Sequence, residues 1–221
     1  MPRSSAFLIA SVLLAALAAV ASGGSLRVRS SPVATPCVEA AGRAWSAETG
    51  LTVAVETGGL RDEGVWDILV GAGVEITRAL EGGDAIIDSD VDIARIPWVL
   101  QLSGGGEVST LSDVVRSNTE ILMLAGPAAY EARRALSQKG TVRARETTDV
   151  ARLRSAPVAL VPLSLAGPGR QVEVEIPPIP VIAAVGLRSR FVEDATGFVR
   201  YLGSERGQDV FAACEVPAPP Q

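Results

Sequence analysis

Short apolar runs alternate with helical patterns along most of this 221-residue chain. In the first third of the chain the pattern predicts three strands and two helices: strands over 26–29, 51–55 and 66–70, and helices over 35–48 and 76–80. Short turns rich in Gly or Ser separate these elements. Such alternation indicates an α/β fold, in which mostly parallel sheets are flanked by helices.

The segment 119–140 carries the clearest local signal in the chain. A short apolar run, Ile121–Leu124, meets Gly126-Pro127, and a helical pattern follows that stops at Gly140. This order predicts a strand, a tight turn and a helix, because Pro is favoured at the first helical position and Gly just after the last. The free N–H groups of such a helix start favour an anion or a polar ligand. The plainer interpretation is an ordinary strand–helix connection.

Two breaks divide the chain into lobes. The Gly-rich stretch 103–106 follows a strand-like run over 96–102, and Pro177-Pro178 precedes a second run over 181–187. We expect these runs to pair as a two-strand hinge, and two helices after them to return to the first lobe. The predicted domains are a discontinuous first lobe of residues 22–102 and 178–221 and a second lobe of residues 103–177.

The first residues are typical of a targeting segment. Arg3 supplies a positive charge, residues 6–21 are almost wholly apolar or small, and Ala19-Val20-Ala21 fits the rule for signal-peptide cleavage. The run is short for a membrane span, which needs about 20 residues. We therefore predict a signal peptide over residues 1–21 and an exported protein, periplasmic or extracellular, with an uncleaved membrane anchor as the alternative.

Composition excludes several classes of function. A formal net charge of −5 without a basic cluster argues against nucleic acid as a partner. The absence of His removes His-based catalytic triads and most catalytic zinc sites. Asp67 or Glu56 could act as a lone general base, but a structural role for Asp67, bonding to loop backbone, fits its place at a strand end better. We predict no enzyme activity, no catalytic residue, no metal site and no cofactor.

Cys37 and Cys214 are the only cysteines in the sequence, and they lie near opposite ends of the mature chain. In an oxidising compartment an isolated pair is most simply a disulfide, which the chain-entropy model values at about 5 kcal/mol for so long a loop. Free reactive thiols are the other interpretation. A disulfide here would return the C-terminus to the first helix.

Three segments together resemble one protein family. The strand Trp66-Asp67-Ile68-Leu69-Val70-Gly71-Ala72 is similar to Ala-Asp-Val-Phe-Ile-Ser-Ala in that family, and the turn of segment 119–140 is similar to its Gly-x-Pro turn. The sequence over 198–211 is similar to its closing pattern Phe-x-x-Phe-Leu-x-Ser-x-x-Gly-Gln-x-x-Phe. The family is that of the type II periplasmic solute-binding proteins, and the molybdate-binding proteins of ABC importers resemble the chain most.

The resemblance implies a tetrahedral oxyanion held between the lobes by neutral donors, and it assigns positions to them. The ligand-binding positions that carry over are Ser30, Ser31, Thr57, Gly58, Gly59, Ala128 and Val150. Pro162 stands where the family has a Tyr, so one hydroxyl donor is lost, and the connection from Gly59 to Trp66 is shorter than in the family. These departures describe a degenerate anion site.

The function implied is that of the extracytoplasmic substrate-binding protein of an ABC-type importer. It would act as a monomer that captures a small solute, such as molybdate or tungstate, in the cleft between the lobes and delivers it to the transporter permease. The alternative is an exported sensor or interaction protein that keeps the binding-protein fold without transport.

Overall fold

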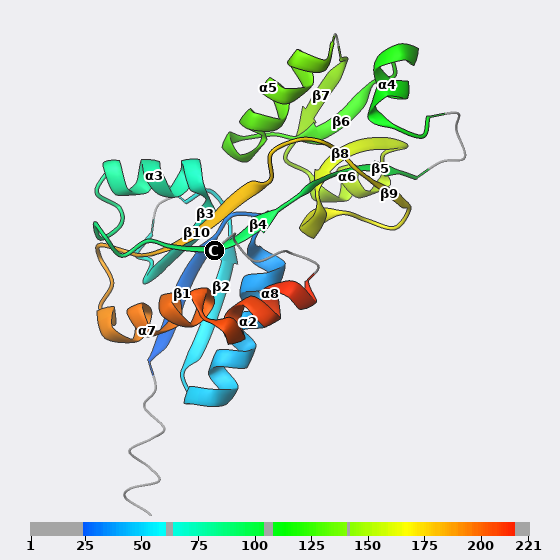
Figure 1. Cartoon of the computed structure of the whole chain (residues 1–221). Helices are drawn as coiled ribbons and strands as arrows, with labels where there is room; N and C mark the ends of the chain where they lie inside the picture. Colours follow the sequence, from blue (N-terminus) through cyan, green and yellow to red (C-terminus); the bar gives the residue numbers. More distant parts are fainter. Residues whose placement is uncertain (1–23, 61–63, 104–107, 141, 215–221) are drawn as a thin grey trace, which may run out of the picture.

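The computed structural model describes residues 24–60, 64–103, 108–140 and 142–214. Within these residues the chain forms two lobes, each built on a five-stranded sheet with helices on its faces (Figure 1). The predicted signal peptide over residues 1–21 lies outside the described residues. None of the helices in the described part of the chain combines the length and the apolar character that a membrane span requires.

The first lobe collects elements from both ends of the sequence. Its strands are β1 (Ser25–Ser30), β2 (Thr52–Thr57), β3 (Ile68–Ala72), β4 (Val91–Ile96) and β10 (Ile179–Val185), and its helices are α2 (Thr35–Thr49), α3 (Gly73–Glu81), α7 (Val192–Gly203) and α8 (Glu205–Ala213). The strand order is β2-β1-β3-β10-β4. β1 pairs in parallel with β2 and β3, whereas β10 is antiparallel to β3 and β4. The sheet is therefore mixed.

The second lobe is continuous in sequence. Its elements are β5 (Trp98–Leu102), α4 (Leu111–Ser117), β6 (Ile121–Leu124), the short 3-10 helix η1 (Pro127–Ala129), α5 (Tyr130–Lys139), β7 (Ala144–Thr147), α6 (Val150–Ser155), β8 (Val158–Pro162), the 3-10 helix η2 (Leu163–Leu165) and β9 (Arg170–Glu173). The order β7-β6-β8-β5-β9 again combines parallel pairs, β6 with β7 and β8, with antiparallel ones. The predicted α/β fold with two lobes is confirmed. Both sheets are mixed, whereas the sequence predicted mostly parallel ones.

Local sequence signals set the ends of the best-predicted helices. α2 begins with Pro36 in its first turn, where a missing N–H costs nothing. It ends at Gly50, which has φ 75° and donates its N–H to the Ser46 carbonyl at 2.9 Å. The strand, turn and helix predicted over 119–140 are also confirmed, as β6, η1 and α5. Gly126 stands at the turn between them with φ 110°, in the region that favours glycine.

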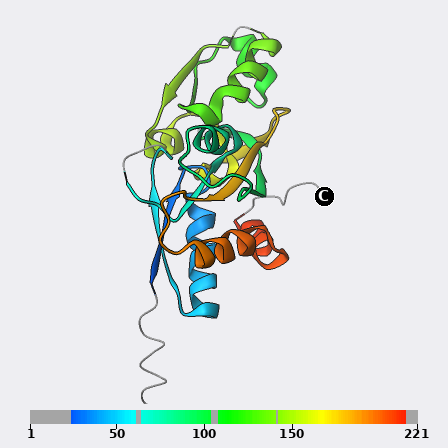
Figure 2. The same ribbon diagram turned by 90° about the vertical axis from the view of Figure 1, so that its left-hand side faces the viewer.

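The chain passes twice between the lobes (Figures 1 and 2), but the predicted pairing of the runs 96–102 and 181–187 with each other is wrong. The first crossing is at Pro97, and the second lies over 174–178. The prediction of one strand over 96–102 was wrong, because Pro97 divides it: β4 pairs with β10 in the first sheet and β5 pairs with β8 and β9 in the second. The lobe boundary therefore falls at Pro97 and not after residue 102.

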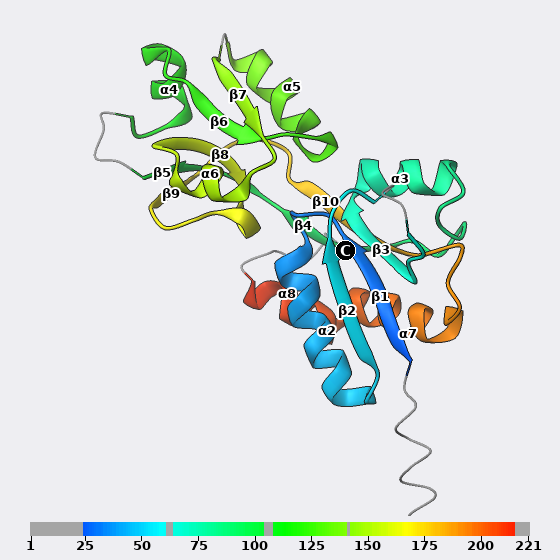
Figure 3. The same ribbon diagram turned by 180° about the vertical axis from the view of Figure 1, so that it is seen from behind.

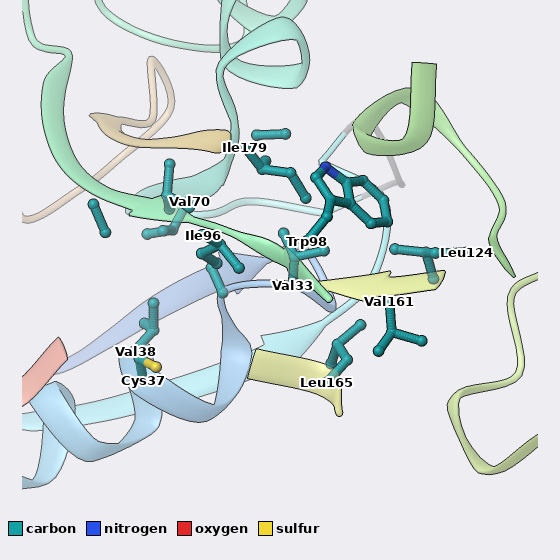
Figure 4. Packing of buried hydrophobic residues seen from close by; sticks show 14 of the residues in the cluster. Val33, Cys37, Val38, Val70, Ile96, Trp98, Leu124, Val161, Leu165 and Ile179 are labelled. Carbon is teal, nitrogen blue, oxygen red and sulfur yellow. The ribbon is translucent and has the colours of Figure 1, made fainter. Parts of the chain in front are cut away.

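A single cluster of buried hydrophobic residues extends through both lobes. Trp98, the first residue of β5, has 1% of its surface exposed and lies opposite Pro162 in the pairing of β5 with β8. Figure 4 shows its ring at the junction, among Val33 and Ile179 from the first lobe and Leu124 from the second. The two lobes thus share one core at the hinge.

The last two helices return to the first lobe. α8 contacts α2 and α7, and Figure 3 shows it beside α2. Trp45 of α2 lies against two aromatic rings of α7, with ring centroids 5.9 Å from Phe198 and 5.1 Å from Tyr201. The expected return of the C-terminal helices onto the first helix is confirmed.

The predicted disulfide is wrong for this structure, in which Cys37 and Cys214 are both free thiols and are not at disulfide distance. The packing of α8 on α2 brings the two residues into the same region without joining them. Cys37 is fully buried in the core. Burial, together with the neighbouring Cys214 thiol, raises the pKa of Cys37 far above its ordinary value. Burial and a raised pKa both disfavour reaction of Cys37 with an external reagent.

We expect the two thiols to differ in their reaction with iodoacetamide. Cys214 is half-buried, so it should be alkylated much faster than Cys37, which should react only after unfolding. Mass spectrometry of a time course at about pH 8, with the Cys214→Ser variant as control, measures both rates. A chain that stays unlabelled in denaturant until a reductant is added would instead contain the disulfide.

Candidate functional site

The predicted serines lie in a tightly bonded turn after β1. Ser31 donates its N–H to the Val70 carbonyl at 2.8 Å, which ties the turn to β3. The Ser30 carbonyl accepts the N–H of Gly58 at 3.0 Å, which ties it to the loop after β2. Both serines are buried, with 0% and 2% of their surface exposed. The structure therefore brings Ser30, Ser31 and Gly58 together at one edge of the first sheet.

The hydroxyl groups at this edge mostly bond to the protein itself. Thr57 donates its hydroxyl to Thr35 Oγ1 at 3.1 Å, and Thr35 donates its own to the Ser31 carbonyl at 3.0 Å. Ser30 Oγ donates to the Ser31 carbonyl at 3.3 Å. An oxyanion held here by Ser30 or Thr57 would have to displace these hydrogen bonds.

Gly59 lies in the loop after β2, and the Arg29 side chain contacts this loop. The Gly59 carbonyl accepts a hydrogen bond from Arg29 Nε at 3.1 Å, and the Arg29 guanidinium lies 4.9 Å from the centre of the Trp66 ring. Arg29 also pairs with Glu56 at 3.8 Å. The Arg29 guanidinium, at the end of β1, therefore contacts this loop and its neighbours Glu56 and Trp66.

Two predicted ligand residues belong to the second lobe. Ala128 lies in η1 and Val150 is the first residue of α6, and both are half-buried. The Asp149 carboxylate caps α6 by accepting the N–H groups of Ala151 at 2.9 Å and Arg152 at 3.2 Å. Because a carboxylate already occupies these donors, the start of α6 is a poor anion site.

A cavity of about 250 Å³ lies between the lobes on the side of α3. Its walls are the start of α3 (residues 72–74), Trp98, the start of the η1–α5 segment, and residues 177–180, which comprise the end of the second crossing and the start of β10. α3 and η1 contact each other across the lobes. Of the predicted ligand residues, Ala128 is the one that lines this cavity.

Glu75 places a carboxyl group beside the predicted oxyanion site. Its Oε2 accepts the N–H of Ala72 at 3.0 Å, as in a capping box at the start of α3. Ser31 Oγ is buried and makes no well-formed hydrogen bond. It lies close enough to the Glu75 carboxyl group to stabilise the ionised form of that group. Burial raises the pKa of Glu75 in spite of the Ala72 N–H, the Ser31 hydroxyl and Arg78. A carboxyl group here opposes an anionic ligand.

A hydrogen bond closes the other side of the interlobe region. Ser164 Oγ, in η2 of the second lobe, donates to the Val33 carbonyl of the first lobe at 2.6 Å. Val33 is fully buried in the shared core. The two lobes are therefore in contact on both sides of the hinge.

Asp67 has a structural role, although its partners are a backbone N–H of strand β1 and a side-chain hydroxyl, and not the loop backbone that the sequence predicted. Its carboxylate accepts the N–H of Arg27 at 2.9 Å and the hydroxyl of Ser189 at 2.7 Å. Within the described residues no group of three or more Cys, Asp or Glu side chains is placed to hold a metal ion.

Sequence reasoning missed three residues of the interlobe region: Glu75, Ser164 and Tyr130. Glu75 had a local signal, since it lies three residues after the strand-ending Ala72 in the capping-box position. Ser164 and Tyr130 had no local sequence signal, because each lies beside residues that are far away in the sequence.

Comparison with known proteins identifies the fold. No protein-family model matches the sequence, and no curated protein matches it. Solved structures do match. The periplasmic molybdate-binding protein of Azotobacter vinelandii has a TM-score of 0.73 at 16% identity, over 88% of this chain and 100% of that one.

Two further solved structures are similar to this chain over most of its length. The sulfate-binding protein SubI from Mycobacterium tuberculosis has a TM-score of 0.68 at 16% identity, over 88% of this chain and 87% of that one. Peb3 from Campylobacter jejuni has a TM-score of 0.65 at 14% identity, over 88% and 100%. The chain has the fold of a type II periplasmic solute-binding protein. At these identities the likeness establishes this binding-protein fold and leaves the ligand open.

Replacing Glu75 by Gln should stabilise the protein increasingly as the pH rises. The pKa of Glu75 in the folded state lies above the ordinary value of 4.5, so the folded state binds the proton more tightly. The wild type therefore loses stability as the pH rises from about 4.5 through the folded-state pKa, by about 1.4 kcal/mol per unit of elevation. Glutamine keeps an oxygen for the Ala72 N–H and avoids this loss.

Urea denaturation of wild type and E75Q between about pH 4 and pH 8 measures the difference. The control is Glu81→Gln, which removes an exposed carboxylate from the same helix. A stability difference between E75Q and wild type that is constant across this range would contradict a buried, destabilising carboxylate.

Ser164→Ala should lower the free energy of unfolding by about 1 kcal/mol, because the Val33 carbonyl loses its donor from the other lobe. Ser155→Ala is the matched control, since Ser155 Oγ bonds only locally to Arg152 within α6. Equal effects of the two variants in urea denaturation would show that the bridge between the lobes contributes nothing.

Proposed function

We propose that this protein is the extracytoplasmic solute-binding component of an ABC-type importer and that its solute binds between the two lobes. The observation that carries the proposal is the interlobe cavity, whose walls come from both lobes and from a crossing. In a two-lobe binding protein a solute held in such a place stabilises the closed arrangement, which a permease can then distinguish from the open one. The targeting segment supports export.

The geometry supports an organic solute better than molybdate or tungstate. The hydroxyls of Ser30 and Thr57 are bonded within the first lobe, and Asp149 caps the start of α6. Glu75 adds a carboxyl group where the family resemblance would place an oxyanion. Among the described hydroxyl groups at that edge, Ser31 Oγ makes no well-formed hydrogen bond. A single free hydroxyl next to a carboxyl group contributes little to an oxyanion site.

Native mass spectrometry of the protein, purified without refolding from the exported fraction, tests solute capture directly. We expect a bound small organic molecule, released on unfolding. Thermal shift measurements with molybdate, tungstate, sulfate and phosphate should show no stabilisation. A shift with molybdate that Ser31→Ala abolishes and Ser155→Ala preserves would establish the oxyanion function instead.

Import is the part of the proposal that separates it from a sensor or interaction protein. A strain that lacks this gene should take up the identified solute several-fold more slowly, and the wild-type gene should restore uptake. Unchanged uptake, together with solute binding in vitro, would favour a binding protein without transport.

A further inference from the structure

The wall of the interlobe cavity is uncharged and poor in hydrogen-bond donors. None of its described lining residues carries a charge, and four of them are prolines: Pro127, Pro177, Pro178 and Pro180. Proline has no backbone N–H to donate. The N–H of Ala72, which also lines the cavity, is already bonded to Glu75 Oε2 at 3.0 Å. A charged solute would lose its hydration here without gaining a partner of opposite charge, which is costly.

The inner part of the wall is apolar as well. Trp98 and Ile179 line the cavity with 1% and 4% of their surface exposed, and Figure 4 shows them side by side. The start of α3 packs closely on the neighbouring residues: a Cβ added at Gly73 would lie 3.2 Å from Pro180 Cγ. This wall is therefore formed before any solute arrives, and it offers mainly dispersion contacts.

Two exposed side chains bring apolar surface to the cavity from opposite lobes. Val74, in α3, has 40% of its surface exposed, and Tyr130, in α5, has 58%. Both line the cavity. A solute that covered them would remove apolar surface from water on both lobes at once, which favours the arrangement in which the lobes are together.

The Glu75 carboxyl group further disfavours an anion. Glu75 directly follows the lining residue Val74, and its carboxyl group lies at the start of α3. No described cation in the cavity wall would offset the repulsion. A cation gains little in return, because the Glu75 carboxyl group bonds to the Ala72 N–H and does not line the cavity. The surroundings therefore favour a solute without charge.

The size of the cavity suits a molecule of about one ring. Its volume is about 250 Å³. An apolar cavity of about 150 Å³ is enough to bind benzene, so this one has room for a six-membered ring with a small substituent. It lies below the range of about 300–1,000 Å³ that is typical of sites for drug-sized ligands.

We propose that this cavity binds an uncharged, apolar organic molecule of about the size of one substituted ring. Its body packs between the proline rings and the side chains of Val74 and Tyr130, and burial of apolar surface supplies most of the affinity. This inference rests on the proposed function, for which it names the substrate class.

The test measures binding of three probes with the same ring to the full exported protein by isothermal titration calorimetry. Benzyl alcohol is uncharged, benzoate is an anion and benzylamine is a cation at neutral pH; ribose serves as an uncharged probe without an apolar body. We expect benzyl alcohol to bind at least tenfold more tightly than each of the others. Equal or tighter binding of a charged probe would overturn the preference for an uncharged solute, and equal or tighter binding of ribose would overturn the need for an apolar body.

Two substitutions at exposed positions locate the binding site. Tyr130→Ala should weaken benzyl alcohol binding about fivefold or more, because it removes apolar surface from the second-lobe side of the cavity. The control is Phe191→Ala, which truncates an exposed aromatic side chain outside the cavity. Val74→Asp should weaken binding tenfold or more, because the ligand would cover a charge. Ile87→Asp, at an exposed apolar position outside the cavity, is its control. Losses equal to those of the controls would overturn the assignment of this cavity.

Native mass spectrometry of the exported protein separates this inference from the proposed function. A co-purified solute that is uncharged and mainly apolar supports both. If the co-purified solute is an ion or a sugar, this inference fails and the proposed function stands. If no probe binds and no solute co-purifies, both fail.

Discussion

The packing of Trp98 at the junction of the two sheets is the constraint on which the rest of the structure depends. Pro97 ends the first sheet at β4, and the next residue begins the second sheet with its side chain fully buried. Because residues from both lobes pack around this ring, the larger of the two hydrophobic clusters in the described residues continues through the hinge. Separating the lobes would expose part of that core, at a cost of about 25 cal/mol for each Å² of apolar surface.

The shared core affects what a ligand must do. In this arrangement the lobes are held together by the protein's own contacts, including the Ser164–Val33 hydrogen bond. On the proposed function, a solute between the lobes would add to contacts that the protein already makes by itself. The exposed side chains of Val74 and Tyr130 line the cavity from the two lobes. Burial of apolar surface would therefore be the main contribution to affinity.

The same polar groups cannot both build the turns and bind a solute. The hydroxyls of Ser30 and Thr57 resemble donors in the sequence, yet both make their hydrogen bonds within the turns where they lie. At the start of α6, where Val150 was predicted to bind a ligand, the Asp149 carboxylate accepts the first N–H groups. Ser30, Ser31, Thr57 and Gly58 do meet at one edge of the first sheet. What spacing could not show is the direction of each hydroxyl, because that depends on partners such as Thr35 and on the Glu75 carboxyl beside Ser31.

The sequence by itself determined the fold class, the two crossings, the strand–turn–helix of residues 119–140 and the return of the last helices to α2. Periodicity, Pro and Gly carry these features locally, because they act through backbone geometry within a few residues. Tertiary structure alone decided that β5 belongs to the second sheet, that the two neighbouring thiols are not joined, and that the interlobe cavity is lined by apolar residues, Trp98 among them. These features depend on contacts between residues distant in sequence, where each position is set by the packing of a whole lobe.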